Sequence, residues 1–164
     1  MTLDLTGDLV TLFRDVVDTE SVSGNERALA DLVEGALRRY PHLAVVRDGD
    51  TVVARTNLGR AERVVIAGHL DTVPVAGNLP SRIEGDLVHG RGTSDMKGGV
   101  TVALACAAQL VQPNRDITWI FYDHEEVAAE DNSLTRVARE HPQWLAGDFA
   151  VLMEPTSAQV EGGC

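Results

Sequence analysis

The sequence predicts an α/β fold in which a mostly parallel sheet is flanked by helices. Three short, continuously apolar segments, 63–68, 117–123 and 148–153, have the composition of strands that are buried on both faces of a sheet. Segments whose apolar residues recur at helical spacing alternate with these strands. Such an alternation of helices and strands favours a layered α/β architecture.

The remaining elements follow from local patterns along the chain. A first helix is predicted over about 7–18, and a second after Ser23–Glu26, whose S-x-x-E pattern is that of a capping box. The second helix has an apolar stripe over 29–37 and ends at Tyr40–Pro41. Further predicted elements are a hairpin (43–47 and 51–55), a short strand (87–89), a helix over 96–111, and a helix over 133–140 that Asn132 caps.

Composition restricts the function. The chain has 164 residues, enough for one domain with a hydrophobic core. Its net charge of -11 would repel phosphate backbones, so we expect no nucleic-acid partner. No apolar run is long enough to span a membrane, and the basic start of a secretory signal is missing. The two cysteines suggest no disulfide framework, so we expect a cytoplasmic protein.

Metal-type ligands follow each of the three predicted strands. His69 and Asp71 come directly after the first strand, Glu125 and Glu126 after the second, and Glu154 after the third. In open α/β sheets, ligands bind in the crevice outside the carboxyl ends of the strands. If the three strands are parallel neighbours, these side chains converge on one crevice.

Asp95 is the remaining acidic candidate, in the glycine-flanked loop 90–99 that opens the helix over 96–111. Imidazole and carboxylate ligands without thiolate are typical of catalytic zinc sites. Carboxylates this numerous would repel one another strongly without cations, so two divalent ions are expected. The alternative is that loop 90–99 binds phosphate, but it lacks the Lys-Ser/Thr ending of a phosphate loop, and Asp95 would repel phosphate.

Together, the motifs resemble the aminoacylase/carboxypeptidase-type family of di-zinc hydrolases. Residues 68–74 (GHLDTVP), 90–98 (GRGTSDMKG), 125–126 (EE) and 154–155 (EP) are similar to family motifs, in the family's order and at similar intervals. Within the family, the segments 53–59, 71–82 and 154–164 resemble the actinobacterial-type succinyl-diaminopimelate desuccinylases.

The resemblance implies a set of site residues. His69, Asp95 and Glu154 would bind one zinc ion, and Asp95 would bridge to a second ion that Glu126 also binds. Cobalt is a possible replacement for zinc.

The resemblance also implies the catalytic roles. Glu125 would be the general base, and Asp71 would orient His69. The expected reaction is hydrolysis of the succinyl amide of N-succinyl-LL-2,6-diaminopimelate. This small acyl-amino-acid would be the substrate of a cytoplasmic homodimer that binds neither nucleic acid nor membranes.

The chain departs from this family in length. Family members are about twice as long, so residues 1–164 are expected to be the N-terminal segment of the catalytic domain, incomplete at its C-terminus. The lid and dimerisation domain and the remainder of the catalytic domain, with a late histidine for the second zinc site, would be absent. His42, His89 and His141 are expected to be surface or structural residues. His124 is expected to be structural, with a role behind the metal ligands as the alternative.

Two alternatives remain open at this stage. One is a related deacylase, such as an acetylornithine deacetylase, or a dipeptidase, because substrate choice in the family depends largely on the lid. The other, of a different class, is a metal-binding fragment that is catalytically incomplete.

Overall fold

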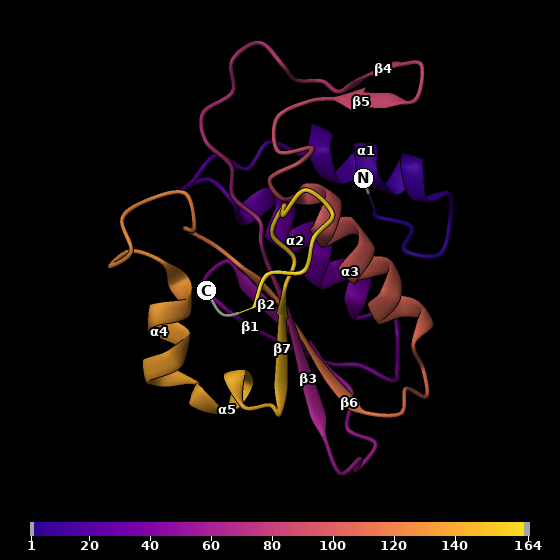
Figure 1. Cartoon of the computed structure of the whole chain (residues 1–164), viewed down its shortest axis with the longest axis vertical. Coiled ribbons are helices and arrows are strands. Elements are labelled where there is room, and N and C mark those ends of the chain that lie inside the picture. The colour runs from indigo at the N-terminus through magenta and orange to yellow at the C-terminus, as the bar shows by residue number, and fades with distance from the viewer. Residues whose placement is uncertain (1, 163–164) are drawn as a thin grey trace.

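The computed structural model describes residues 2–162 and shows a five-stranded sheet with helices on both of its faces (Figure 1). The helices are α1 (Leu9–Asp18), α2 (Arg27–Leu37), α3 (Lys97–Gln109), α4 (Ser133–Glu140) and α5 (Pro142–Leu145). The strands are β1 (Ala44–Asp48), β2 (Thr51–Arg55), β3 (Arg63–His69), β4 (Arg82–Glu84), β5 (Leu87–His89), β6 (Asp116–Tyr122) and β7 (Phe149–Leu152). The α/β fold expected from the sequence is confirmed.

The sheet is mixed, and its strand order is β1-β2-β6-β3-β7. Strand β3 lies between β6 and β7 and is parallel to both, so the three predicted strands are parallel neighbours. The predicted hairpin β1–β2 joins the other edge, where β2 pairs antiparallel with β6. Strand β4, which the sequence pattern did not indicate, pairs antiparallel with β5 in a separate two-stranded sheet.

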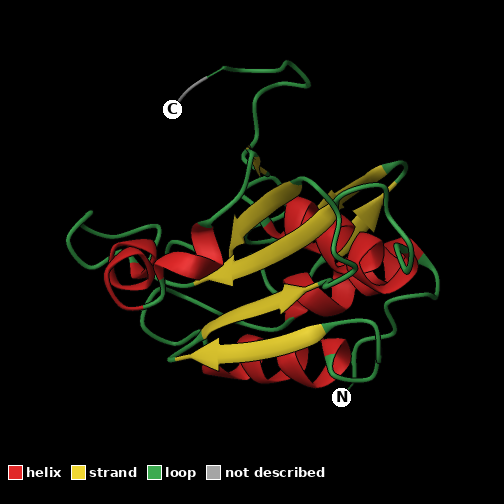
Figure 2. Cartoon of the chain, turned by 90° about the horizontal axis from the view of Figure 1, so that it is seen from below, coloured by secondary structure: helices red, strands yellow, loops and turns green. Residues whose placement is uncertain are grey.

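The sheet separates two hydrophobic clusters because successive strand side chains point to opposite faces. Trp119 and Phe121 of β6 belong to the larger cluster, which α1, α2 and α3 complete. Ile120, between them in sequence, faces the smaller cluster with Val137 of α4 and Trp144 of α5. Figure 2 shows α4 and α5 on the side of the strands away from the other helices. No helix within residues 2–162 has the length and apolarity required to cross a membrane.

Strand β7 differs from its prediction as a buried strand. All four of its residues are exposed, and the side chains of Phe149 and Leu152 are 66% and 46% exposed. The strand pairs only with β3 and lies at the edge of the sheet. The apolar run therefore predicted the strand correctly but predicted its burial wrongly, because no described element covers β7.

The capping box predicted before α2 is also wrong, although the helix itself is present. The helix begins at Arg27, and no side chain caps its first turn. The Ser23 hydroxyl instead donates a 2.7 Å hydrogen bond to the Asp71 carboxylate, and the Glu26 side chain is completely buried. By contrast, the Asn132 side chain does cap α4, accepting a 2.9 Å hydrogen bond from the Leu134 amide.

Asp116 fixes the loop that connects β2 to β3. Its carboxylate accepts hydrogen bonds of 2.8 Å from the Thr56 hydroxyl, 2.8 Å from the Leu58 amide and 2.9 Å from the Arg60 amide. Burial by itself would raise the pKa of Asp116, but these hydrogen bonds outweigh it and lower the pKa to about 2. The ionised carboxylate therefore stabilises the folded chain.

We predict that Asp116→Asn lowers the free energy of unfolding by about 2 kcal/mol at pH 7, because an amide cannot accept all three hydrogen bonds. The pKa is lower in the folded state, so the contribution is present above about pH 4 and is lost as the pH falls toward about 2. Urea denaturation at both ends of this range measures the difference. Asp86→Asn is the control, because the Asp86 side chain is exposed and forms no hydrogen bond with any residue of 2–162. Equal losses for the two variants at pH 7 would contradict the assignment.

Candidate metal centre

The predicted site residues lie at one edge of the parallel part of the sheet. His69 is the last residue of β3, Glu125 and Glu126 follow the end of β6, and Glu154 follows the end of β7. Because these strands are parallel neighbours, their carboxyl ends meet at the same edge. Asp95 reaches this edge from the loop before α3.

His69 lies at the centre of this group. Its Nε2 atom is 3.1 Å from Oδ1 of Asp95 and 3.9 Å from Oε2 of Glu154. His69, Asp95 and Glu126 each offer a ligand atom, and these atoms all lie within 4.8 Å of one another. The His69 side chain is fully buried, whereas that of Asp95 is 52% exposed, so the group is open on one side. The structure thus brings together all four residues predicted as metal ligands.

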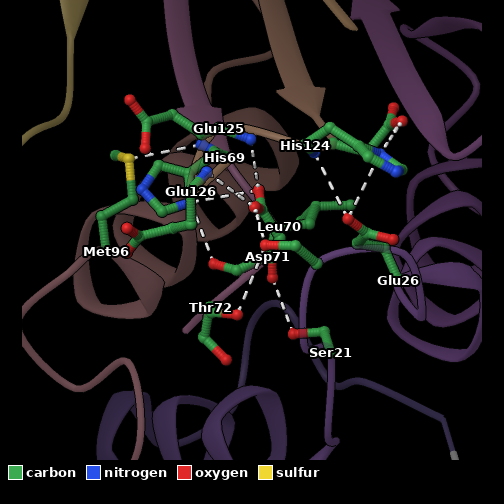
Figure 3. A network of polar contacts seen from close by, with 12 residues as sticks. Ser21, Glu26, His69, Leu70, Asp71, Thr72, Met96, His124, Glu125 and Glu126 are labelled. Atoms are coloured by element: carbon green, nitrogen blue, oxygen red, sulfur yellow. Dashed lines mark hydrogen bonds and ion pairs between the residues drawn. The ribbon is translucent and has the colours of Figure 1, made fainter. Parts of the chain in front are cut away.

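Asp71 forms hydrogen bonds with His69 and with the backbone of the glutamate pair. The Nδ1 atom of His69 lies 2.9 Å from the Asp71 carbonyl oxygen and 3.4 Å from its carboxylate, which orients the imidazole. The carboxylate also accepts hydrogen bonds from the amides of Glu125 (3.0 Å) and Glu126 (2.9 Å). Figure 3 shows Asp71 at the centre of these contacts. Asp71 therefore also holds the backbone of the glutamate pair, which the sequence did not predict.

The electrostatics favour a bound cation. Burial raises the pKa of Glu126 and Glu154, and the neighbouring Asp95 carboxylate raises both further. Burial would lower the pKa of His69, but the Asp71 hydrogen bond and charge reverse this and raise it to about 9. One buried imidazole among several carboxylates is a donor set that suits Zn²⁺, with its preference for nitrogen and oxygen ligands. The residues therefore fit a divalent metal.

A close approach at Gly68 positions the loop that contains Asp95. The Met96 side chain packs against Gly68 so closely that a Cβ atom there would lie 2.8 Å from Cε of Met96. The Met96 sulfur also accepts a 3.3 Å hydrogen bond from the His69 amide. These contacts attach the residue after Asp95 directly to the end of β3.

A second glycine sets the position of the chain after β7. A Cβ atom on Gly99, in the first turn of α3, would lie 2.7 Å from the carbonyl oxygen of Met153. Only a residue without a side chain allows this approach. Glu154 follows Met153, so Gly99 allows the chain that carries Glu154 to lie against the start of α3.

A further group of possible ligands, Asp48, Glu140 and His141, lies between the end of β1 and the end of α4. Here Arg136 donates a 3.0 Å hydrogen bond to the Asp48 carboxylate and another to its carbonyl oxygen. The guanidinium already supplies the positive charge, so this group is not a metal candidate. His141 stacks on the ring of Trp144, as expected for a structural histidine.

The other histidines lie outside the metal-ligand group. His42 contacts the Ala107 carbonyl oxygen at 2.9 Å, and His89 lies 3.5 Å from Glu84 on the small sheet. His124 lies behind the glutamate pair, where its Nδ1 is 2.9 Å from Asp123. The sequence missed the involvement of Ser23 and Glu26, because their spacing is also that of a helix cap.

The fold and the donor set define a metal-binding α/β domain of the kind that hydrolytic metalloenzymes use. Residues 65–163 match the model of peptidase family M20/M25/M40. The chain belongs to this family, and the membership implies a metal cofactor.

Two curated relatives have similar sequences over almost the whole chain. A protein of Mycobacterium tuberculosis named putative succinyl-diaminopimelate desuccinylase DapE is 50% identical over 163 residues, which are 99% of this chain and 46% of the relative. The succinyl-diaminopimelate desuccinylase of Corynebacterium glutamicum is 48% identical over 167 residues, covering 99% of this chain and 45% of its own length. The chain thus spans about half the length of these relatives.

Solved structures share the fold at much lower identity. The M20 family metallo-carboxypeptidase Sso-CP2 of Sulfolobus solfataricus superposes with a TM-score of 0.78 at 17% identity, covering 90% of this chain and 37% of its own. Aminopeptidase PepT of Bacillus cereus gives a TM-score of 0.70 at 16% identity, covering 92% and 44%. These likenesses show the fold alone.

We predict that Gly99→Ala destabilises the chain by about 1–3 kcal/mol, because the new methyl group would overlap the Met153 carbonyl oxygen. The matched control is Gly35→Ala in α2, where a Cβ atom would meet nothing within 4 Å. That variant should gain about 0.5–1 kcal/mol from helix propensity. Urea denaturation measures both changes. If Gly99→Ala were as stabilising as Gly35→Ala, the close approach would not constrain this segment.

Proposed function

We propose that the chain is part of a zinc-dependent hydrolase of N-succinyl-LL-2,6-diaminopimelate that releases succinate and LL-2,6-diaminopimelate. The observation that carries the proposal is the identity of 50% and 48%, over 99% of the chain, to two proteins named as succinyl-diaminopimelate desuccinylases. The grouping of His69, Asp95 and Glu126 at the edge of the sheet supports a metal-assisted reaction.

Four residues would hold the metal. His69, Asp95 and Glu154 would bind one zinc or cobalt ion, and Asp95 with Glu126 would bind a second ion. A bound divalent ion makes a water molecule more acidic and polarises a substrate carbonyl group. The Asp71 carbonyl oxygen accepts from Nδ1 of His69, and this bond would leave Nε2 directed toward the metal, which would displace the Nε2 proton on binding.

Glu125 would be the general base. Its backbone is fixed by the hydrogen bond to Asp71, and its partly exposed side chain lies beside the ligand group in Figure 3. The Glu125 carboxylate would take a proton from the attacking water and hold it at its oxygen. It would then give the proton to the nitrogen of the leaving amine as the amide bond breaks.

We further propose that residues 1–164 form the N-terminal segment of the catalytic domain of a longer, cytoplasmic, homodimeric protein. A lid and dimerisation domain and the rest of the catalytic domain would complete it, including a histidine for the second ion. The 46% coverage of the Mycobacterium tuberculosis relative supports this proposal. The exposed apolar side chains of β7 are consistent with further chain packing at that edge.

Two alternatives make different predictions. A related deacylase or dipeptidase would share the site but prefer another substrate, such as acetylornithine, in an assay of the full-length protein. A catalytically incomplete metal-binding fragment would bind zinc without hydrolysing any of these amides. Comparing the chain with the full-length protein on succinyl-diaminopimelate and on acetylornithine separates these cases.

We predict that Glu126→Gln has opposite effects on the metal-free and the zinc-bound chain. Without metal, removing one of several repelling carboxylates should raise the melting temperature by a few degrees, since Asp95 and Glu125 both disfavour its charge. With zinc, losing a ligand should weaken binding by at least about 100-fold and reduce the stabilisation that zinc provides. Thermal unfolding with and without Zn²⁺ measures both effects.

Glu130→Gln is the control for this experiment, because Glu130 is exposed on the loop after the glutamate pair and its side chain forms no hydrogen bond among the described residues. Glu130→Gln should leave the melting temperature nearly unchanged both without metal and with Zn²⁺. A Glu126→Gln chain that zinc stabilises as much as the wild type would remove Glu126 from the ligand set.

We predict that Glu125→Ala lowers kcat of the full-length enzyme by about 10²–10⁴-fold, the range expected for loss of a general base. Zinc affinity should stay within about threefold, because Glu125 is not among the proposed ligands. Steady-state kinetics and zinc titration measure the two quantities, with Glu130→Ala as the control. Near-normal turnover in Glu125→Ala would refute the assigned role.

A further inference from the structure

Three consecutive backbone amides after β6 donate hydrogen bonds to two buried carboxylates. The His124 amide donates to Oε1 of Glu26 at 3.3 Å. The next two amides, of Glu125 and Glu126, donate to the two oxygens of Asp71 at 3.0 and 2.9 Å. This segment belongs to no helix or strand, so these bonds replace regular secondary structure in fixing its backbone.

Glu26 occupies a costly position. Its side chain is fully buried, and no lysine or arginine within residues 2–162 forms an ion pair with it. Oε1 also accepts a 3.0 Å hydrogen bond from the Gly24 amide, whereas Oε2 has no hydrogen-bond partner among the described residues. Burying a carboxylate with so few partners costs free energy. A contribution to the site would account for a carboxylate at this position.

His124 completes the connection to Glu26. Its backbone has a φ angle of 60°, in the left-handed region that non-glycine residues rarely adopt. Its Nδ1 atom lies 2.9 Å from the Asp123 carboxylate and 3.4 Å from Oε1 of Glu26. Figure 3 shows the Glu26–His124 pair on the side of Asp71 away from His69. Glu26 therefore holds the segment 124–126 on the side opposite His69, and the pair does not face the metal-ligand group.

The segment before α2 is tied to the same place. The Ser23 hydroxyl donates to Asp71, and the Ser23 amide donates to the Thr72 carbonyl oxygen at 3.1 Å. The carboxylates of Asp71, which follows β3, and of Glu26, which precedes α2, thus join residues 23–26 to residues 124–126. A shift of Glu26 would be transmitted through the His124 amide to the residue that follows it.

We propose that Glu26 and His124 are positioning residues, which hold the backbone of Glu125 and Glu126 so that their side chains meet His69 and Asp95. The inference rests on the proposed function for the roles of Glu125 and Glu126. Neither Glu26 nor His124 touches the substrate or a metal. Glu26 acts by accepting the hydrogen bond from the His124 amide, and His124 acts through its left-handed backbone conformation.

The first test is hydrogen exchange of the wild-type, metal-free chain, followed residue by residue by NMR. The amides of residues 124–126 should exchange at least about 100-fold more slowly than those of 127–130, which form no hydrogen bond in this exposed loop. If the amide hydrogens of 124–126 exchanged as fast as those of 127–130, this result in the wild-type chain would overturn the proposal. This measurement does not depend on metal binding.

The second test compares three variants. Glu26→Leu keeps the size of the side chain but removes both acceptors, and should speed exchange of 124–126 selectively and weaken Co²⁺ binding by about 10–100-fold. Glu26→Gln keeps an acceptor at Oε1 and should restore both properties to within about threefold. Glu34→Gln is the control, because Glu34 lies within α2, the helix that follows Glu26, and pairs with Arg38 and Arg47 instead. It should lower stability without affecting the segment.

The visible absorption spectrum of bound Co²⁺ reports the ligand geometry and should change in Glu26→Leu alone. A folded Glu26→Leu chain with wild-type exchange and spectrum would overturn the proposal, and so would a Glu26→Gln chain as impaired as Glu26→Leu. If the wild-type chain bound neither Co²⁺ nor Zn²⁺, the proposed function would fail, while the exchange data would still decide whether Glu26 and His124 fix the segment.

Discussion

The site depends on one buried carboxylate, that of Asp71. It accepts hydrogen bonds from the Ser23 hydroxyl and from the amides of Glu125 and Glu126, and it lies beside the His69 imidazole. These donors hold the pKa of Asp71 well below its usual range although burial opposes ionisation. A single ionised group thereby orients the central imidazole and fixes the two glutamates relative to it.

The acidic groups around His69 oppose one another in the folded chain. Glu126 and Glu154 both have a raised pKa, from burial and from neighbouring carboxylates such as Asp95. The chain therefore assembles negative charge at a cost that a bound cation would offset. Glu26 adds to this cost on the other side of Asp71, because burial raises the pKa of the Glu26 carboxyl and the Asp71 charge raises it further. Such concentrated, unfavourable charge is characteristic of functional sites and is not explained by fold stability.

Close packing at two glycines sets the dimensions of the site. Gly68 and Gly99 allow the start of α3 to approach the ends of β3 and β7, and the Met96 side chain fills the space between them. The parallel register of β3 with β6 and β7 places the three strand ends at one edge. The same fold occurs in a metallo-carboxypeptidase that is only 17% identical, so its architecture tolerates wide sequence change.

The sequence by itself determined the α/β class, the residues that gather at the site and most of the element types, although not strand β4, because apolar runs and the ligand types that follow them are local patterns. His69, Asp95, Glu126 and Glu154 were predicted in this way, and the structure brings them together. Only the tertiary structure decided that β7 is an exposed edge strand and that Ser23 and Glu26 bond to the site and do not cap α2. Burial and hydrogen-bond partners depend on segments far apart in the chain. The same Ser and Glu spacing satisfies a helix end or a distant carboxylate, and only packing selects between them.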